Sequence, residues 1–492
     1  MTERGSPTLS RHMHATSRPR LRDRVALAYS RGADVTALTR RQRRWLVAIL
    51  LVAFGLRLSW VIYAARPARG FHDPLFYSVY GRSIGDGDGY RLVNGPQQGQ
   101  PTAYYPVGYS AALGFIFTIM KLFPFGENEP VAIAAFNLLL GMGTVLLVFE
   151  AGRRLFDNRI GIVAAGLIAV YPNLIFHTAV ALTETLFNFI MMGALVVMVW
   201  RPWTGRLGRW QLVLFGALLG ASALVRPISF LVLPGLLVVW LLAGLGWRRA
   251  VEYLAVIGIT AAVVIAPWTI RNIIVMKSPV LISTNLGDNL CIGRHPGATG
   301  AFDVNINPND ISRKDYCFHD LGDTTRPAYE IRRNSLTMRR ALEYMRKHPL
   351  DEFRLGFWKA YYTVQNDYDG LDASESYGTS KFIRPRIRAV FETAANFWFW
   401  STSALGLLGL RFFTSRRHPR RQFFLLAMVG LILPIFIFFG DVRFHLPVVP
   451  LLLVAAAATI VTICTNVGEP DDDDGAGDRD EATPAAVPAP SG

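Results

Sequence analysis

One acidic residue, Asp73, stands at the head of a short amphipathic segment, Phe71 to Tyr80. The order Asp-Pro predicts a helix start with Asp73 as N-cap and Pro74 as the first helical residue, because proline has no amide hydrogen to leave unsatisfied. Apolar residues then recur at helical spacing, which predicts a helix lying on a membrane surface: Leu75, Phe76, Val79 and Tyr80. The helix dipole favours an ionised carboxylate there, and an ionised, oriented carboxylate is what a general base requires. The alternative, that Asp73 only caps the helix, is open at this point.

Other ionisable residues fall at the ends of apolar runs, where charge is costly and often functional. The main candidates are Glu184, His177, Arg226, Arg443 and His445. If the apolar runs alternate across a membrane, all of them reach the same face as Asp73. Carboxylates, guanidiniums and imidazoles grouped in this way could hold an anionic headgroup and a base, as a reaction on a lipid-linked phosphate requires.

Each candidate also has a simpler interpretation. An arginine at the end of an apolar run can reach lipid phosphates with no further role, and this applies to Arg226 and Arg443. His177 fits a hydrogen-bonded turn residue better than a metal ligand. Glu184 and Arg57 lie inside apolar runs and need partners, and for Arg57 a structural ion pair is favoured over substrate contact.

The composition predicts an integral membrane protein. Of the 492 residues, 51% are hydrophobic and 18% are charged, and the mean hydropathy is +0.28. The chain contains repeated uncharged runs of about twenty residues, the length that a helix needs to cross a bilayer. The formal charge of +15 comes from basic residues in tails and short loops beside these runs. That placement is typical of topology signals at an anionic lipid surface. No nucleic-acid-binding motif is present, so nucleic acid is not expected as a partner.

The apolar runs predict an all-α polytopic membrane protein with about ten spans. These spans are residues 45–65, 131–150, 159–172, 178–200, 210–226, 228–246, 251–269, 393–413, 422–440 and 444–464. Residues 107–123 are also apolar, but a crossing there would invert the positive-inside pattern. This stretch is therefore predicted to be a helix at the outer interface, anchored by neighbouring tyrosines. Arginines of the short loops then all face the cytoplasm: Arg153, Arg154, Arg206, Arg209, Arg248, Arg249, Arg416, Arg417, Arg420 and Arg421.

The regions outside the spans differ in composition. At the two ends, residues 1–44 are predicted to be an Arg-rich, mostly disordered cytoplasmic tail, and residues 466–492 a disordered cytoplasmic tail. The membrane part is predicted to comprise a module over 45–269, which includes an external loop (66–129), and C-terminal spans over 391–465. Between these two parts lies a soluble external segment (270–390) with a helical stretch near 327–365. Cys291 and Cys317 share the external segment, where a disulfide is permitted but not required. Cys464, in an apolar run, is interpreted as a small hydrophobic residue.

Several segments, in their order and spacing, resemble the GT-C superfamily of polytopic glycosyltransferases, in the branch of the protein O-mannosyltransferases and the lipid A aminoarabinose transferase. They extend from about residue 45 to residue 464 and comprise FHDPLFYSVYGRSI, AYYPVGYSAALGFIFTIMKLF, GRRLFDNRIGIVAAGLIAVYP, LTETLF, ALVRPISFLVLP, APWTIRN, STNLGDNLCIGRHPGATG and RFHLPVVPLLL.

The resemblance implies a GT-C helix bundle in the plasma membrane, with helices beside the membrane on its outer side. It implies inverting transfer of a hexosyl or pentosyl group from a polyprenyl-phosphate donor to an acceptor hydroxyl at the extracytoplasmic face. The acceptor would be a cell-envelope glycan, a lipid or a protein. The resemblance also places the catalytic carboxylate on the first external loop, at Asp73, and matches a second acidic residue to Glu184 by position.

Roles for the remaining candidates follow from this expected reaction. The donor phosphate is expected to meet Arg443, Arg226 and His445, and Tyr104 and Tyr105 are expected to shape the groove for the lipid. A divalent metal ion held by Glu184 and His177 is an alternative source of positive charge. Many relatives carry a second acidic residue directly after the catalytic one, where this chain has Pro74, which weakens the case for metal binding by an adjacent pair.

Two functions other than transfer account for part of the sequence. A transporter or flippase of lipid-linked sugars would also need many helices and buried arginines. It would, however, show internal repeats and a polar site at mid-membrane more often than this chain, whose polar candidates gather near one face. A structural membrane subunit without chemistry leaves Asp73 and Glu184 unexplained.

Overall fold

The computed structural model describes residues 36–92, 98–122, 128–201, 203, 207–302, 316–318, 321 and 328–466. The greater part of both tails expected to be disordered lies outside these residues, and so does Arg206. The described part is helical, with two isolated β-bridges and no β-strand. The prediction of an all-α membrane fold is confirmed.

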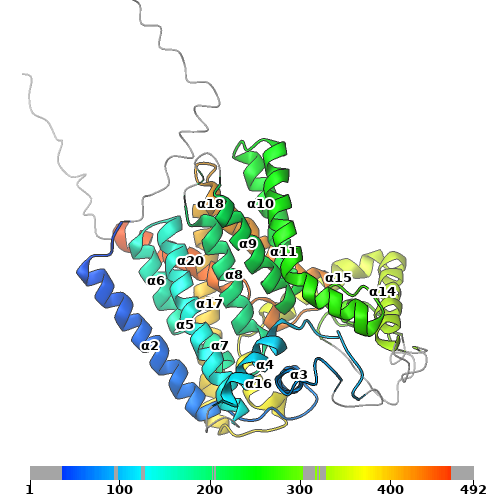
Figure 1. Cartoon of the computed structure of the whole chain (residues 1–492). Helices are drawn as coiled ribbons and strands as arrows, with labels where there is room; N and C mark the ends of the chain where they lie inside the picture. The colour runs from blue at the N-terminus through cyan, green and yellow to red at the C-terminus, as the bar shows by residue number, and fades with distance from the viewer. Residues whose placement is uncertain are drawn as a thin grey trace, which may run out of the picture.

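The long helices form one bundle (Figure 1). Their bounds are α2 (Arg40–Ala64), α5 (Glu129–Leu155), α6 (Asn158–Ala169), α8 (Thr183–Val199), α9 (Arg209–Val225), α10 (Val232–Leu242), α11 (Trp247–Met276), α17 (Pro385–Gly409), α18 (Pro419–Ile432) and α20 (Val449–Asn466). Short helices continue or connect them: α7 (Pro172–Phe176), η1 (His177–Ala179), η2 (Pro227–Leu231), η4 (Leu410–Phe413), α19 (Pro434–Ile437) and η5 (Val442–Phe444).

Each predicted span coincides with one apolar helix, or with a helix and the short helix next to it. By length and composition, four of the described helical stretches can cross a membrane: α2, α5, α11 and α18 with α19. Helix α6 and the short helical stretch that follows it (Pro172–Ala179, α7 with η1) form a pair bent by 61° that could be one further span. Further apolar helices are shorter. The expectation of about ten crossings therefore stays a prediction.

One end of the bundle gathers arginines from the short loops. Arg420 Nη1 donates to the carbonyl of Val199 (3.1 Å), and Arg421 Nε donates to the carbonyl of Leu155 (2.7 Å). Arg153 Nη2 reaches the carbonyl of Thr36 (3.4 Å). These contacts bring the last residues of α5 and α8 and the first residues of α18 together, just beyond the start of α2. The positive-inside interpretation requires such a grouping, and the side of the membrane on which it lies stays a prediction.

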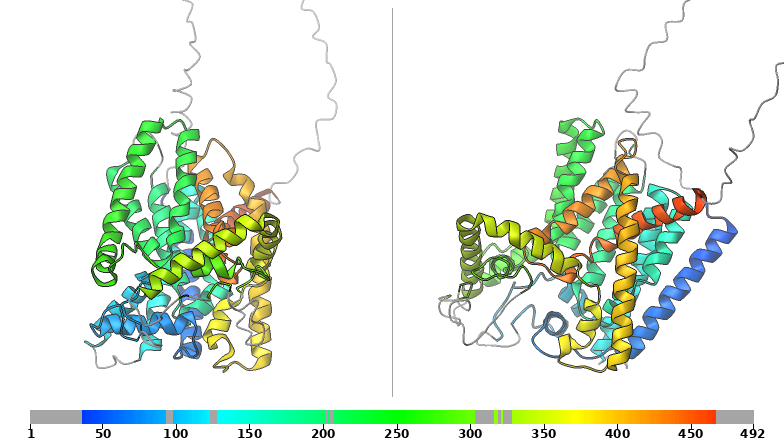
Figure 2. Two further views of the ribbon diagram at one scale, coloured as in Figure 1. Left: turned by 90° about the vertical axis from the view of Figure 1, so that its right-hand side faces the viewer. Right: turned by 180° about the vertical axis from the view of Figure 1, so that it is seen from behind.

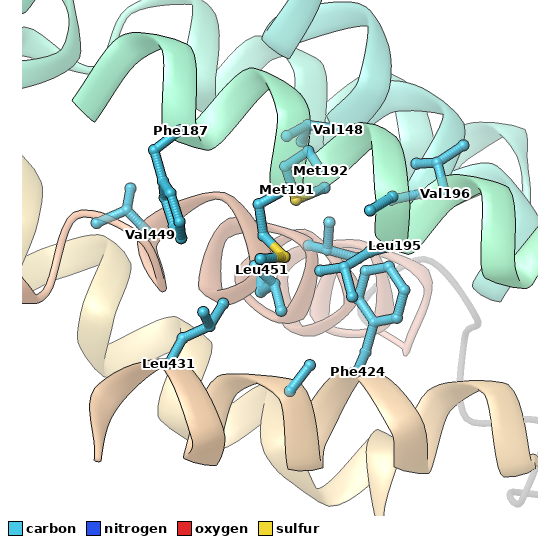
Figure 3. Packing of buried hydrophobic residues seen from close by; sticks show 14 of the residues in the cluster. Val148, Phe187, Met191, Met192, Leu195, Val196, Phe424, Leu431, Val449 and Leu451 are labelled. Carbon is cyan, nitrogen blue, oxygen red and sulfur yellow. The ribbon is translucent and has the colours of Figure 1, made fainter. Parts of the chain in front are cut away.

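The core lies where α5, α6, α8, α18 and α20 meet. Figure 3 shows Phe187, Met191 and Leu195 of α8 facing Leu431 of α18 and Leu451 of α20.

Helices α9 and α11 approach closely where α9 carries glycines, which have no side chain. A Cβ at Gly216 or Gly220 of α9 would lie 2.6 or 2.8 Å from carbonyl oxygens of α11, so this small-xxx-small pair lets the two backbones approach.

Arg57 is buried in α2, but the favoured ion pair is not what satisfies it. Its Nη1 donates to the carbonyl of Ala169 (2.8 Å) and its Nη2 to the carbonyl of Ile168 (3.3 Å), at the C-terminus of α6. The last carbonyls of a helix lack partners within it and carry partial negative charge. A helix end therefore takes the place of the expected carboxylate.

The region opposite the arginine-rich end consists of shorter helices. Helices α3 (Asp73–Gly85) and α4 (Gly108–Met120) pack closely, because a Cβ on Gly81 would lie 2.8 Å from Leu113 Cβ. Helix α4 agrees with the helix predicted over 107–123.

The segment after α11 holds α12 (Leu286–Ile292), α14 (Tyr329–Lys347), α15 (Pro349–Val364) and α16 (Asp369–Ser374). Cys291 and Cys317 form a disulfide, and Cys464 is exposed on α20.

Candidate active site

Four charged side chains from distant parts of the chain meet at the end of the bundle opposite the arginine-rich loops. Arg443 Nη1 donates to Asp73 Oδ2 (2.7 Å), and Arg443 Nε donates to Glu184 Oε1 (2.7 Å). Arg226 Nη2 also bonds Glu184 Oε1, while Arg226 Nε donates to Thr183 Oγ1 (2.7 Å). The alternating order of carboxylates and guanidiniums places each charged group next to one of opposite charge.

Asp73 is not the cap of its helix. Helix α3 begins at Asp73 itself with His72 as N-cap, and no side-chain capping bond is present at this described helix start. The Asp73 carboxylate instead accepts hydrogen bonds from Arg443 and from the Tyr105 hydroxyl, whose oxygen lies 2.9 Å from Oδ1. The interpretation of Asp73 as only a cap therefore loses its physical basis.

Helix α3 buries Pro74, Tyr77, Tyr80 and Gly81 against the protein. Leu75, Phe76 and Val79, which belong to the face predicted to lie on the membrane, are partly exposed, and their contact with the membrane stays a prediction. The tyrosines turn inward because other aromatic rings receive them. Tyr77 packs edge-on against Tyr109 of α4 with ring centroids 5.6 Å apart, and Tyr80 lies 4.8 Å from Tyr90.

Chain breaks hold the site residues in place. Arg226 is extended between the end of α9 and Pro227, a break that proline enforces because it cannot continue the hydrogen-bond ladder. Arg443 lies in η5, where the Asp441 side chain accepts from the Arg443 amide (2.8 Å). The turn before it requires Gly440, because a Cβ there would lie 2.3 Å from the carbonyl oxygen of Lys359.

A second set of polar residues lies behind Arg443 and includes His445, which does not face the charged centre. His445 is buried, with Nδ1 2.7 Å from the carbonyl of Thr363, Nε2 2.9 Å from Asp367 Oδ1, and its ring stacked on Phe399. Both ring nitrogens are occupied by protein partners. The structure thus gives His445 a role in joining α15 to the site and no support as a phosphate ligand.

His177 and Asp369 extend the centre on the α16 side. His177 Nδ1 lies 2.8 Å from the carbonyl of Asn173, and Nε2 lies 3.5 Å from Asp369 Oδ2. Asp369 Oδ2 in turn lies 3.9 Å from Arg443 Nε. His177 is thus a hydrogen-bonded turn residue, as its simpler interpretation stated.

The consecutive tyrosines point to different partners. Tyr105 contacts Asp73, while the Tyr104 hydroxyl donates to Asp288 Oδ2 (2.8 Å), which also pairs with Arg333 of α14 (2.7 Å). Tyr105 therefore belongs to the charged centre. Tyr104 instead connects that centre to the segment after α11.

Burial shifts the acid–base properties of the groups around the centre. Burial and the charge of Asp73 raise the pKa of Tyr105 well above its ordinary value, so the hydroxyl stays protonated and can donate. Burial raises the pKa of Asp441, and the charge of Asp369 adds to this shift. Burial alone would lower the pKa of His177, but nearby Asp369 and Glu184 outweigh it and raise that pKa.

The donor set does not fit a metal ion at Glu184 and His177. One Glu184 oxygen already lies between two guanidiniums, which would repel a cation. Within the described ranges, no group of three or more His, Cys, Asp or Glu side chains is arranged to hold a metal ion. We therefore assign no step to a metal at these residues.

Sequence reasoning missed several residues of this site: Thr183, Asp367, Asp369 and Asp441. Asp367 and Asp369 lie in a long polar segment where acidic residues are common, so composition gave no reason to select them. Asp441 was visible within the segment that carries Arg443, and its position two residues ahead of that arginine matches a local capping turn.

The chain is similar to one protein family and to several solved structures. The model of the family described as dolichyl-phosphate-mannose-protein mannosyltransferase matches residues 96–270, a range with Glu184 and Arg226 but without Asp73 and Arg443. Among curated protein sequences, none matches the chain. The chain is similar to the oligosaccharyltransferase of Archaeoglobus fulgidus crystallised with Zn and sulfate, at a TM-score of 0.51 and 16% identity, covering 86% of this chain and 49% of that one.

Two further solved structures show weaker similarity. The archaeal oligosaccharyltransferase AglB from Archaeoglobus fulgidus, in complex with an inhibitory peptide and a dolichol-phosphate, has a TM-score of 0.49 and 16% identity, covering 87% of this chain and 51% of that one. ArnT from Cupriavidus metallidurans bound to undecaprenyl phosphate has a TM-score of 0.38 and 15% identity, covering 86% of this chain and 79% of that one.

These findings define the class of protein. The chain is a membrane protein with the fold of the GT-C superfamily of glycosyltransferases, as its sequence segments indicated. It spans about half the length of the archaeal oligosaccharyltransferase that it matches. The fold alone does not fix the reaction, which has to be argued from the site.

Proposed function

We propose that this protein is an inverting glycosyltransferase that moves a sugar from a polyprenyl-phosphate donor to an acceptor hydroxyl, with Asp73 as general base. The observation that carries the proposal is the accessibility of Asp73. Its side chain is 29% exposed, whereas that of Glu184 is fully buried. Asp73 is thus the carboxylate of this pair that an acceptor can reach, and two donors fix its orientation.

In the proposed step the acceptor oxygen attacks the anomeric carbon from the face opposite the phosphate. The new carbon–oxygen bond forms as the bond from the anomeric carbon to the phosphate oxygen breaks. The hydroxyl proton passes to Asp73, and polyprenyl phosphate leaves with the bonding electrons. General base assistance of this kind contributes about 10²- to 10⁴-fold in rate.

The guanidiniums are suited to neutralise the leaving phosphate. Arg443 uses Nε and Nη1 for its carboxylate partners, and its Nη2 has no hydrogen-bond partner among the described residues. Arg226 likewise leaves Nη1 unused. Preorganised donors of this kind stabilise charge that develops in a transition state. Glu184 then serves to hold both guanidiniums beside Asp73.

Two observations support this reading over a transporter of lipid-linked sugars. The charged centre lies at one end of the bundle, beside the helices α3 and α16. The description of the matching family model, dolichyl-phosphate-mannose-protein mannosyltransferase, names a transferase. The direct test is to incubate membranes containing the protein with radiolabelled polyprenyl-phosphate sugars. Label moving to an acceptor supports transfer, and label that only changes leaflets supports transport.

Tyr105 offers a graded test of how Asp73 is oriented. Tyr105→Phe removes one hydrogen bond to the carboxylate while keeping the ring, and a bond to a charged group is worth about 1.5–3 kcal/mol. We expect a transfer rate roughly tenfold or more below that of the parent protein, with unchanged donor binding. Single-turnover transfer measured beside donor binding checks this. A rate equal to the parent's would show that Tyr105 does not orient the base.

Labelling tests the proposed topology, in which α4 does not cross the membrane. In a Cys464→Ser background, Leu122→Cys places a thiol at an exposed position just after α4. We expect an impermeant reagent added to intact cells to label it. Arg159→Cys, at the arginine-rich end, is the matched control and should react only after permeabilisation. Labelling of Leu122→Cys only in permeabilised cells would contradict the assignment.

A further inference from the structure

Helix α15 carries an exposed row of apolar side chains, which is not expected in a segment predicted to be soluble. Leu350, Phe353, Phe357 and Tyr361 are 81%, 82%, 68% and 48% exposed. Their spacing of three or four residues puts them on one face of the helix. Apolar surface left in water costs about 25 cal/mol per Å², so a row of this size indicates a partner.

The opposite face of α15 is fixed to the bundle. Leu355, Lys359 and Thr363 are its buried residues, and Leu355 packs in a cluster with Ala298 and Tyr344. The helix also contacts α19 and η5. The backbone at Lys359 lies against Gly440, where a Cβ would not fit. The exposed row therefore cannot turn inward without breaking this packing.

The exposed row lies beside the exposed apolar surface of a helix pair that can cross a membrane by its length and composition. Helices α18 and α19 form one of the described stretches long and apolar enough to cross a membrane. Their exposed residues include Val429, Leu433 and Phe436, and α15 packs directly on α19. Figures 1 and 2 show α14 and α15 projecting from one side of the bundle.

On α14 and α15, the acidic residues of α15 have protein partners, while two exposed arginines have none among the described residues, and this arrangement suits a lipid surface. The acidic residues of α15 are bound by the protein: Tyr344 donates to Asp351 (2.8 Å), and Arg294 pairs with Glu352 (3.0 Å). Arg346 and Arg354 are exposed and form no ion pair with a described residue. An apolar face flanked by unpaired basic residues is typical of helices that lie in a membrane interface.

We propose that α15 lies in the interface of the bilayer leaflet at the site end of the bundle, with its apolar row among the acyl chains and Arg346 and Arg354 at anionic lipid phosphates. The helix ends next to the site, because His445 Nδ1 lies 2.7 Å from the carbonyl of Thr363. Insertion would thereby fix the height of η5 and its Arg443 relative to the membrane surface. The proposal does not depend on the transferase activity.

Nitroxide accessibility tests this placement in the full-length protein. In a Cys464→Ser background, Phe357→Cys carries the label in the apolar row, and Ser335→Cys, at an exposed polar position on α14, is the matched control. The proteins are reconstituted in nanodiscs of phosphatidylcholine with or without phosphatidylglycerol. We expect the ratio of oxygen to nickel-chelate accessibility to be several-fold higher for the label at residue 357. Equal ratios would overturn the proposal, and so would shielding from both reagents, which indicates contact with protein.

A second variant tests the basic flank. Arg346→Gln with Arg354→Gln, combined with the label at residue 357, keeps the apolar row and removes two charges. We expect phosphatidylglycerol to increase the accessibility ratio in the parent and to have no effect in the variant. An equal increase in both proteins would overturn the assignment of these arginines to anionic phosphates. A size-exclusion profile like the parent's confirms that each labelled protein is folded.

Discussion

Asp73→Asn is expected to abolish transfer almost completely, by about 10²- to 10⁴-fold, in a protein that still folds and still binds the donor. The amide has the shape of the carboxylate, and its oxygen can accept from Arg443 while its NH2 group donates to the Tyr105 hydroxyl. It cannot, however, take up the proton of the acceptor hydroxyl. Transfer of labelled sugar, donor binding and the thermal unfolding midpoint measured on one preparation separate these effects.

A second aspartate supplies the control for this variant. Asp86 follows the end of α3, is exposed and pairs with Lys121 (2.6 Å). Asp86→Asn therefore removes an equal charge just after the same helix and should leave transfer unchanged, because exposed ion pairs contribute little. Transfer near the parent's rate in Asp73→Asn would show that the base lies elsewhere, and Glu184 would be the next residue to test.

Arg443→Ala is expected to reduce donor affinity and turnover together, with a loss in transfer rate of about 10²- to 10³-fold. The guanidinium is the link between Asp73 and Glu184. Its Nη2, which has no hydrogen-bond partner among the described residues, is the nitrogen that we propose binds the phosphate. The fold should survive, because Glu184 keeps Arg226 and Asp73 keeps Tyr105 as partners. Michaelis parameters for the donor, with expression level as a control, check this prediction.

The conservative variant at the same position makes the test specific. Arg443→Lys keeps one positive charge but cannot reach two carboxylates and a phosphate as a planar fork does, so it should restore only part of the lost activity. Full activity in Arg443→Ala would contradict a role at the donor phosphate. It would return this residue to the simpler interpretation of an arginine that reaches lipid headgroups.

The sequence by itself determined the helical architecture and much of the site. Hydropathy and helical periodicity are local properties, so the predicted spans coincide with helices, and the stretch 107–123 is helical as expected. The cost of placing charge in an apolar run is also local, and it was enough to select Glu184, Arg226 and Arg443. A resemblance in segment order added the GT-C fold, which the structure shares.

Only the tertiary structure decided which of these groups meet and which way each one points. The bond between Arg443 and Asp73 joins residues 370 positions apart, and no local pattern encodes such a pair. The same holds for His445, which turns away from the centre because Thr363 and Asp367 occupy its nitrogens. A helical sequence permits a side chain to point in several directions and to bond to several partners. Which of these occurs depends on the elements that pack around the helix, and local sequence does not specify those elements.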